Sequence, residues 1–77
     1  MKKEHVEILK QNLPYLKQIQ GFVESLAEVE QEAFDNLSER AQESEKGEAM
    51  EERAGYLEDA ASSLEDAIGM IEDAINT

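Results

Sequence analysis

The sequence predicts an all-α protein, an antiparallel helical hairpin with a short or kinked N-terminal helix and coiled-coil-like packing. Three observations support this fold class. From Leu57 the chain repeats in sevens as LEDAASS, LEDAIGM and IEDAINT, and such spacing places one continuous apolar stripe along a helix. Residues 16–34 carry a second set of apolar side chains at intervals of three and four, which is typical of an amphipathic helix. A short polar stretch, residues 35–43, separates the two patterns.

Pro14 divides the first half of the chain. We expect a leader or short helix over residues 1–13 and a helix over residues 14–35, because proline inside a helix removes a hydrogen bond and clashes with the preceding turn. Two alternatives stay open, a short helix over residues 3–11 followed by a break, or one long helix kinked at Pro14. The core residues predicted here are Leu16, Ile19, Val23 and Leu26, and Glu30 interrupts their row.

The connection is predicted over residues 36–44 and a heptad helix over residues 45–76. Asn36 or Ser38 caps a short helical turn within the connection, and Ser44 caps the helix that follows, since serine and asparagine side chains accept hydrogen bonds from free backbone N–H groups. Acidic residues in the first turn favour the helix dipole. The heptad helix is expected from about Glu45 to Ile75.

The heptads predict two rows for packing against a neighbouring helix. One row is Met50, Leu57, Leu64 and Ile71, and the other is Ala60, Ala67 and Ala74, with Ala61, Ile68 and Ile75 beside it. Arg53 falls in the second row, so we expect the contact to open there. The small core of a 77-residue chain favours self-association, predicted as a dimeric four-helix bundle. The residues expected to carry it, four of them core residues, are Leu57, Ala60, Leu64, Ala67, Ile68 and Ile71.

The charge is strongly negative and unevenly distributed. The net charge is −12, with seven basic and nineteen acidic residues, and such a chain is repelled by nucleic acid and by anionic membranes. It favours a protein partner with a basic surface; the alternative is that the acidity only keeps the chain in solution. The lysines before residue 18 are expected to lie beside Asp66, Glu72 and Asp73. The lack of cysteine, of a ~20-residue apolar run and of a signal sequence predicts a cytoplasmic protein.

Acidic pairs recur every seven residues along the second helix. They are Glu51-Glu52, Glu58-Asp59, Glu65-Asp66 and Glu72-Asp73. At ~1.5 Å rise per residue the pairs lie roughly 10 Å apart, and this acidic ladder is the predicted partner-binding site. It could imitate a phosphate backbone in the nucleic-acid groove of another protein. The alternative is the solvated outer face of a coiled coil.

No pattern of catalytic, cofactor-binding or metal-binding residues occurs. His5 is the single histidine, so Glu-x-x-His motifs and histidine-based triads are absent. The four glycines are dispersed, and neither a phosphate loop nor an EF-hand is present. The sequence therefore predicts a protein that is not an enzyme.

Residues 32–52, EAFDNLSERAQESEKGEAMEE, and the LEDA heptads that follow carry a family resemblance. The chain resembles small acidic helical proteins of unknown function that phages and integrative elements of Firmicutes encode, over about residues 28–75. Ser38 stands where that group has proline. The resemblance implies a phage context and the host cell cytoplasm, and it favours an inhibitor of a host or defence protein, the class to which anti-CRISPR proteins belong.

Three functions follow in order of preference. The first is a binding inhibitor of a host nucleic-acid-handling or defence protein that acts through the acidic ladder. The second is a structural or assembly module that acts through its coiled-coil stripe. The third is an enzyme or a small-molecule-binding protein, either of which requires a pocket between protomers.

Overall fold

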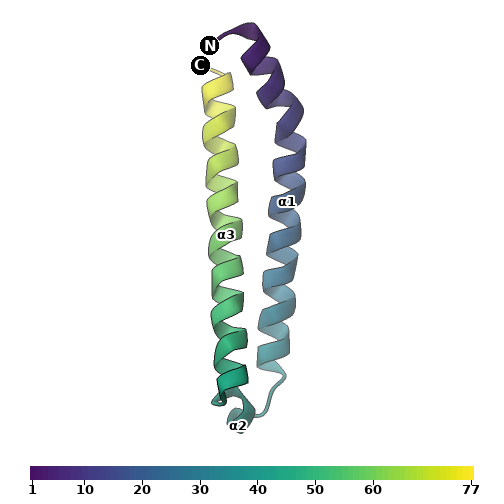
Figure 1. Cartoon of the computed structure of the whole chain (residues 1–77), viewed down its shortest axis with the longest axis vertical. Coiled ribbons are helices and arrows are strands. Elements are labelled where there is room, and N and C mark those ends of the chain that lie inside the picture. Colours follow the sequence, from purple (N-terminus) through teal and green to yellow (C-terminus); the bar gives the residue numbers. More distant parts are fainter.

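The computed structural model describes all residues, 1–77, as three helices without strands: α1 (Lys3–Asp35), α2 (Glu39–Gln42) and α3 (Glu45–Ile75). The prediction of an all-helical protein is confirmed. α1 and α3 lie side by side and run in opposite directions, with α2 at one end and both termini at the other (Figure 1). The molecule measures 57 × 15 × 14 Å with a radius of gyration of 17.3 Å, whereas a compact domain of this length has about 11.5 Å. Every helix therefore remains largely open to solvent.

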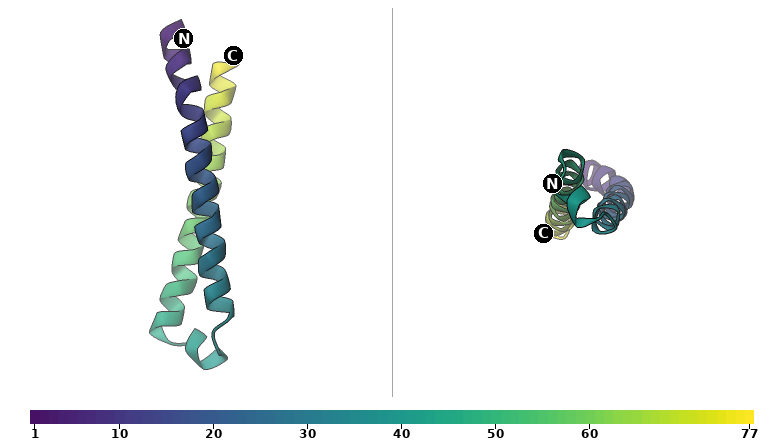
Figure 2. Two further views of the ribbon diagram at one scale, coloured as in Figure 1. Left: turned by 90° about the vertical axis from the view of Figure 1, so that its right-hand side faces the viewer. Right: turned by 90° about the horizontal axis from the view of Figure 1, so that it is seen from below.

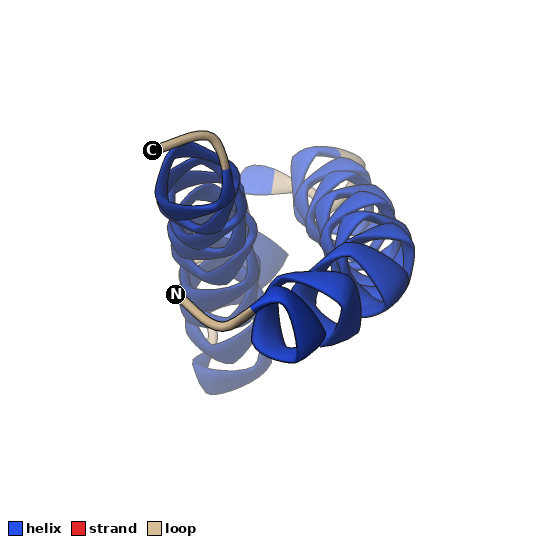
Figure 3. Ribbon diagram, turned by 90° about the horizontal axis from the view of Figure 1, so that it is seen from above, coloured by secondary structure: helices blue, strands red, loops and turns tan.

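α1 runs through Pro14 as a single helix. The break predicted as one alternative is absent, and the helix begins at Lys3 rather than near residue 14. Leu9, Leu13 and Leu16 are half-buried on both sides of Pro14, whose own ring is exposed. Their packing offsets the ~3 kcal/mol that a proline costs inside a helix. The first turns of α1 lean toward the end of α3 (Figure 3), as expected of a helix that bends at proline.

The contact between α1 and α3 follows a strict alternation of three and four residues on both helices. On α1 the alternation runs through the buried and half-buried residues Val6, Leu9, Leu13, Leu16, Gln20, Val23, Ala27, Glu30 and Phe34, and Ala33 beside this line is half-buried as well. On α3 the same alternation runs through Gly47, Met50, Ala54, Leu57, Ala61, Leu64, Ile68, Ile71 and Ile75. This spacing belongs to long helices that cross at a shallow angle, as Figure 2 shows. The buried apolar side chains are few and mostly small, namely Ala27, Ala54, Ala61 and Ile68.

Two core predictions on α1 are wrong. Ile19 is 51% exposed and Leu26 37% exposed, because the contact passes through Gln20 and Ala27 instead. The apolar surface of α1 is wider than one neighbouring helix can cover. α3 therefore covers one pair of rows and leaves the adjacent pair, with Ile19 and Leu26, in solvent.

The second row predicted for α3 is also displaced by one position. Ala60 and Ala74 are exposed, and the row in contact contains Ala54, which is 2% exposed, and Ala61. Arg53 lies outside this row, so the opening expected there does not occur. Both rows have seven-residue spacing, and the bulk of Ile68 and Ile75 favours burial of the row that contains Ala54 and Ala61.

Serine caps fix both ends of the connection. The Ser38 hydroxyl accepts a hydrogen bond from Ala41 N at 3.2 Å, and the Ser44 hydroxyl accepts one from Gly47 N at 3.1 Å. Ser44 is thus confirmed as a cap, and Ser38 rather than Asn36 caps the short turn. The Gln42 side chain ties α2 to the end of α1 by donating to the Phe34 carbonyl at 3.1 Å.

The start of α3 packs closely on the end of α2 at Gly47. This residue is buried, and a Cβ built on it would overlap the Ala41 carbonyl oxygen and lie 2.6 Å from that of Gln42. Both neighbours are backbone atoms, which cannot rotate away. Gly47 therefore permits the chain to reverse tightly between the two long helices.

No helix in the structure combines the length and the apolar composition required to cross a membrane.

We expect Gly47→Ala to lower the free energy of unfolding by about 1–3 kcal/mol, because a methyl group there forces backbone to move. Gly55→Ala is the matched control, since a Cβ at Gly55 meets nothing within 4 Å. That change should stabilise the protein by up to ~1 kcal/mol through helix propensity. Urea unfolding followed by circular dichroism measures both, and equal effects at the two glycines would contradict the close packing of Gly47.

Candidate functional site

The acidic ladder of α3 lies in solvent along the whole helix. Seven of its eight carboxylate residues are exposed, and Glu72 is half-buried. They are Glu51, Glu52, Glu58, Asp59, Glu65, Asp66, Glu72 and Asp73. No other part of the chain buries the seven exposed residues, which are therefore accessible to a partner.

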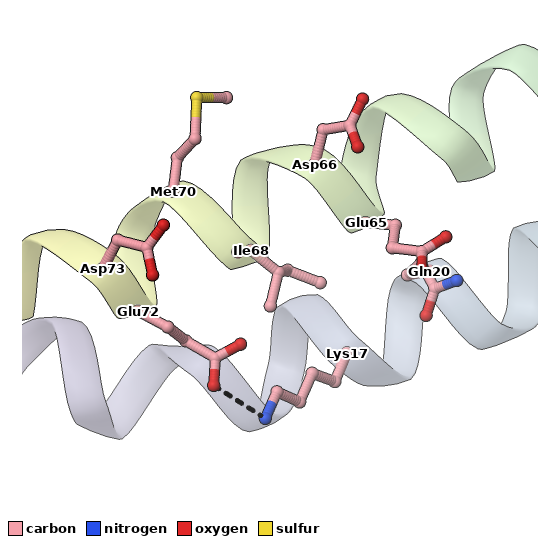
Figure 4. A pocket seen from close by; sticks show the side chains of 9 residues that line it. Lys17, Gln20, Glu65, Asp66, Ile68, Met70, Glu72 and Asp73 are labelled. Atoms are coloured by element: carbon pink, nitrogen blue, oxygen red, sulfur yellow. Dashed lines mark ion pairs between the residues drawn. The ribbon is translucent and has the colours of Figure 1, made fainter.

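The ladder is two rows rather than one. Successive residues of a helix point about 100° apart, so the first member of each pair lies beside α1 and the second faces away from it. Figure 4 shows this for the last two pairs, where Glu65 and Glu72 approach α1 while Asp66 and Asp73 point outward. A partner that contacts both rows must wrap around the outer side of α3.

A single ion pair joins the ladder to α1. Lys17 Nζ lies 3.6 Å from Glu72 Oε2, and both side chains are about half exposed. The expected proximity of an N-terminal lysine to the end of α3 is confirmed at this pair. Exposed pairs contribute roughly 0–1 kcal/mol, so Lys17 orients the helices more than it stabilises them.

Glu24 and Glu28 of α1 lie beside the ladder and form with its eight residues one acidic face, which the sequence analysis missed. Together with Glu58 and Glu65 they line a shallow groove of about 340 Å³ between the helices. No basic residue lines it. The spacing of Glu24 and Glu28 on α1 carries no signal of this role, because the antiparallel register alone brings them beside Glu58 and Glu65.

The groove can attract positive charge, and its remaining lining is small or amide-bearing. Gln20, Ala27, Gln31, Ala61 and Ser62 complete it. A second, wider depression of about 860 Å³ lies toward the end of α3 around Lys17, Glu65 and Glu72 (Figure 4). Nowhere do three or more acidic or histidine side chains converge to hold a metal ion. The chemistry that this face offers is therefore electrostatic attraction of basic side chains over an extended surface.

Glu30 lies in the contact between the helices, where Arg53 reaches it from the side. Arg53 Nη1 donates to Glu30 Oε2 at 3.2 Å. The Glu30 side chain is 26% exposed and that of Arg53 is 55% exposed. The pair thus satisfies a carboxylate that interrupts an apolar row and leaves the acidic face untouched.

The residues predicted for self-association divide between two locations. Leu57, Leu64, Ala67, Ile68 and Ile71 are buried or half-buried along α3, while Ala60 is exposed. The apolar side chains that solvent does reach on α1 are Ile8, Tyr15, Ile19, Phe22, Leu26 and Val29. The exposed apolar surface is therefore mainly on α1, where the sequence analysis did not place it.

Comparison with known protein families, with curated protein sequences and with solved structures finds no match.

We expect added salt to raise the thermal unfolding midpoint. The ladder carboxylates are spaced roughly 10 Å apart, which is about the Debye length at 0.1 M, so NaCl screens their mutual repulsion. The exposed Lys17–Glu72 pair and the partly exposed Arg53–Glu30 pair lose little attraction in return. Circular dichroism melts between 10 and 300 mM NaCl test this. Lys17→Ala serves as a control that should keep the trend, and a falling midpoint would show that the ion pairs outweigh the repulsion.

Proposed function

We propose that this chain is a non-catalytic binding protein whose acidic face engages a basic surface on another protein. The acidic face consists of the eight ladder residues of α3 together with Glu24 and Glu28 of α1. One observation carries the proposal: nine of these ten residues are exposed, and Lys17 is the one basic residue that pairs with any of the ten carboxylates. Glu24 and Glu52 accept hydrogen bonds from Gln20 and Tyr56, which are neutral. A partner rich in arginine and lysine gains attraction along the length of α3 and is steered toward it.

The partner class is proposed from the extended line of negative charge. Successive pairs of the ladder lie roughly 10 Å apart along the helix, a loose match to the one phosphate per ~3.4 Å on each strand of DNA that a nucleic-acid groove accepts. We therefore propose a nucleic-acid-handling or defence protein of the host as the partner, with inhibition by occupation of its groove and DNA mimicry as the mode. The resemblance to phage-encoded acidic proteins supports this and implies action in the host cytoplasm. The chain itself binds neither nucleic acid nor membrane in this proposal.

The architecture proposed for this function is an antiparallel hairpin that works as a dimeric four-helix bundle. A dimer would carry two acidic faces, which increases apparent affinity if both reach one partner.

An assembly module is the second candidate. The six large apolar side chains exposed on α1 favour it, since contiguous exposed apolar surface marks protein contacts. In that case binding resists salt and charge reversal has little effect. Leu64→Lys, which places a charge in the contact between α1 and α3, would then abolish assembly and function together.

The test is capture of proteins from host lysate by wild-type chain and by a variant with Glu58, Asp59, Glu65 and Asp66 changed to lysine. We expect the wild type to retain a nucleic-acid-binding protein at 50 mM NaCl and to release it by 300 mM. The variant should capture none, with unchanged helicity by circular dichroism, and duplex DNA should compete with the wild type for the partner.

The matched control carries the same change in net charge elsewhere. Glu4, Glu32, Glu39 and Glu43 are all exposed and lie outside the acidic face, so their replacement by lysine should preserve capture. Retention of the partner by the variant with four lysines on the acidic face would refute the proposal. Loss of capture in both variants would show that total charge, not the acidic face, binds the partner.

A further inference from the structure

The two sides of the helix pair differ in charge. On α1, Lys17 and Glu24 flank the contact with α3 on one side, and Ile19 and Leu26 flank it on the other. On α3 the flanks are Glu58, Glu65 and Glu72 on one side and Ala60, Ala67 and Ala74 on the other. Lys17 pairs with Glu72 across the contact, so the charged flanks share one side. The apolar flanks must therefore share the opposite side.

That opposite side, the carboxylate-free face, contains two seven-residue stripes. The large side chains on α1 are Ile8, Tyr15, Ile19, Phe22, Leu26 and Val29. The α3 stripe is mostly small, with Ala49, Ala60, Ser63, Ala67 and Ala74 beside Tyr56 and Met70. Near the start of α3 it also contains Lys46 and Arg53, and Arg53 pairs with Glu30 at the edge of the face. None of the nineteen acidic residues falls in either stripe. Tyr15, Phe22, Tyr56 and Met70 are each about two-thirds exposed.

The chain exposes more surface than a folded monomer of its mass. Its accessible area is 5973 Å², whereas a monomer of 8.7 kDa is expected to expose about 4,700 Å². No large side chain is fully buried. Three alanines and one isoleucine form the buried apolar core. Burial of so few side chains stabilises the fold little compared with the conformational entropy that is lost when two long helices become ordered. The excess surface includes the carboxylate-free face.

We propose that the carboxylate-free face binds a second copy of this chain face to face, as a two-fold symmetric dimer of four long helices. The proposal deepens the dimeric architecture proposed above by naming its interface. The distribution of charge favours a second copy as the partner. A second copy carries a net charge of −12, yet its own carboxylate-free face can approach this one because neither of the two faces presents a ladder of carboxylates to the other. A basic partner would gain nothing on a face without carboxylates.

A two-fold axis along the length of the molecule sets the bulky stripe of each α1 on the mostly small stripe of the partner copy's α3. Large residues meet small ones around Phe22, while Tyr15 and Val29, one heptad to either side, lie level with Met70 and Tyr56. Phe22 lies between the levels of the Lys17–Glu72 and Glu30–Arg53 pairs, at the height of Ser63 and Ala67. Phe22 of one copy therefore packs near Ala67 of the other.

The available area is sufficient. A face of 57 by 15 Å has a footprint of about 850 Å², and a stable interface buries about 800 Å² on each partner. In the dimer each α1 contacts α3 of its own chain through one apolar stripe and α3 of the second copy through the other. The acidic faces then lie on the two outer sides.

The first test is sedimentation equilibrium of the full chain from 1 to 200 μM. We expect a mass of twice 8.7 kDa, and dimerisation that strengthens as NaCl rises because the remaining charge repulsion is screened. Phe22→Glu should raise the dimer dissociation constant at least 100-fold, since symmetry introduces the change twice. Gln18→Glu adds the same charge to the exposed outer side of α1 and should change it less than threefold.

Two further measurements test the dimer without relying on the folding of the Phe22→Glu variant. The thermal midpoint of the wild type should rise with protein concentration, as it does for a dimer and not for a monomer. Because the chain has no cysteine, a variant with Phe22→Cys and Ala67→Cys should form a disulfide-linked dimer on mild oxidation. A variant with Gln18→Cys and Ala67→Cys should remain single chains.

The proposal is overturned by a monomeric wild type at 200 μM, by a trimer, or by a dimer that Phe22→Glu leaves intact. Its failure is distinct from failure of the proposed function, because the acidic face is complete in each chain. A monomeric protein that still captures a partner from lysate would contradict the dimer alone, and a dimer that captures none would contradict the acidic-face function alone.

Discussion

The narrow contact between α1 and α3 is the constraint on which the rest of this structure depends. Small side chains at Ala27, Ala54 and Ala61 are its most buried members together with Ile68, so the two helices meet along a line rather than over a broad core. A line of contact holds two long helices in register, yet it leaves most of each helix in solvent. The elongated shape and the large exposed surface follow from this one feature.

The contact also sorts the remaining surface into two sides. Seven-residue periodicity on both helices keeps the same rows of residues beside the contact along its whole length. Glutamates line one side of α3 from end to end, and the other side carries Lys46 and Arg53 followed by Ala60, Ala67 and Ala74. On α1, Glu24 and Glu28 fall beside the glutamates, and Ile19 and Leu26 fall beside the alanines. The result is a helix pair that is acidic on one side and apolar on the other, with charge repulsion and apolar association kept apart.

This separation reconciles two properties that compete in a small acidic protein. A net charge of −12 opposes the approach of identical chains, while a core of a few small side chains favours association as a source of stability. Because no acidic residue lies in the two stripes of the carboxylate-free face, the chain can carry a high negative charge and still associate with a second copy. In the proposed dimer the apolar stripes of α1 and α3 are covered, and the acidic faces remain outside and available to a basic partner. The two proposals thus use different residues and respond oppositely to salt.

The sequence by itself determined the helical fold class, the cap at Ser44 and the acidic ladder, and it narrowed the other cap to Asn36 or Ser38, because helical periodicity and capping are local properties that spacing and residue type report directly. It did not determine which stripe each helix buries. α1 has two adjacent apolar stripes and α3 has two adjacent alanine rows, and either stripe is compatible with a helix. Only the tertiary structure showed that Ala54 and Ala61, and not Ala60, are buried on α3. It likewise showed that Gln20 and Ala27, in place of Ile19 and Leu26, lie in the contact on α1. Which residues are buried depends on how the two helices match along their whole length. The same register brought Glu24 and Glu28 to the acidic face, and Leu9, Leu13 and Leu16 carried α1 through Pro14, since long-range packing outweighed the local cost of the proline.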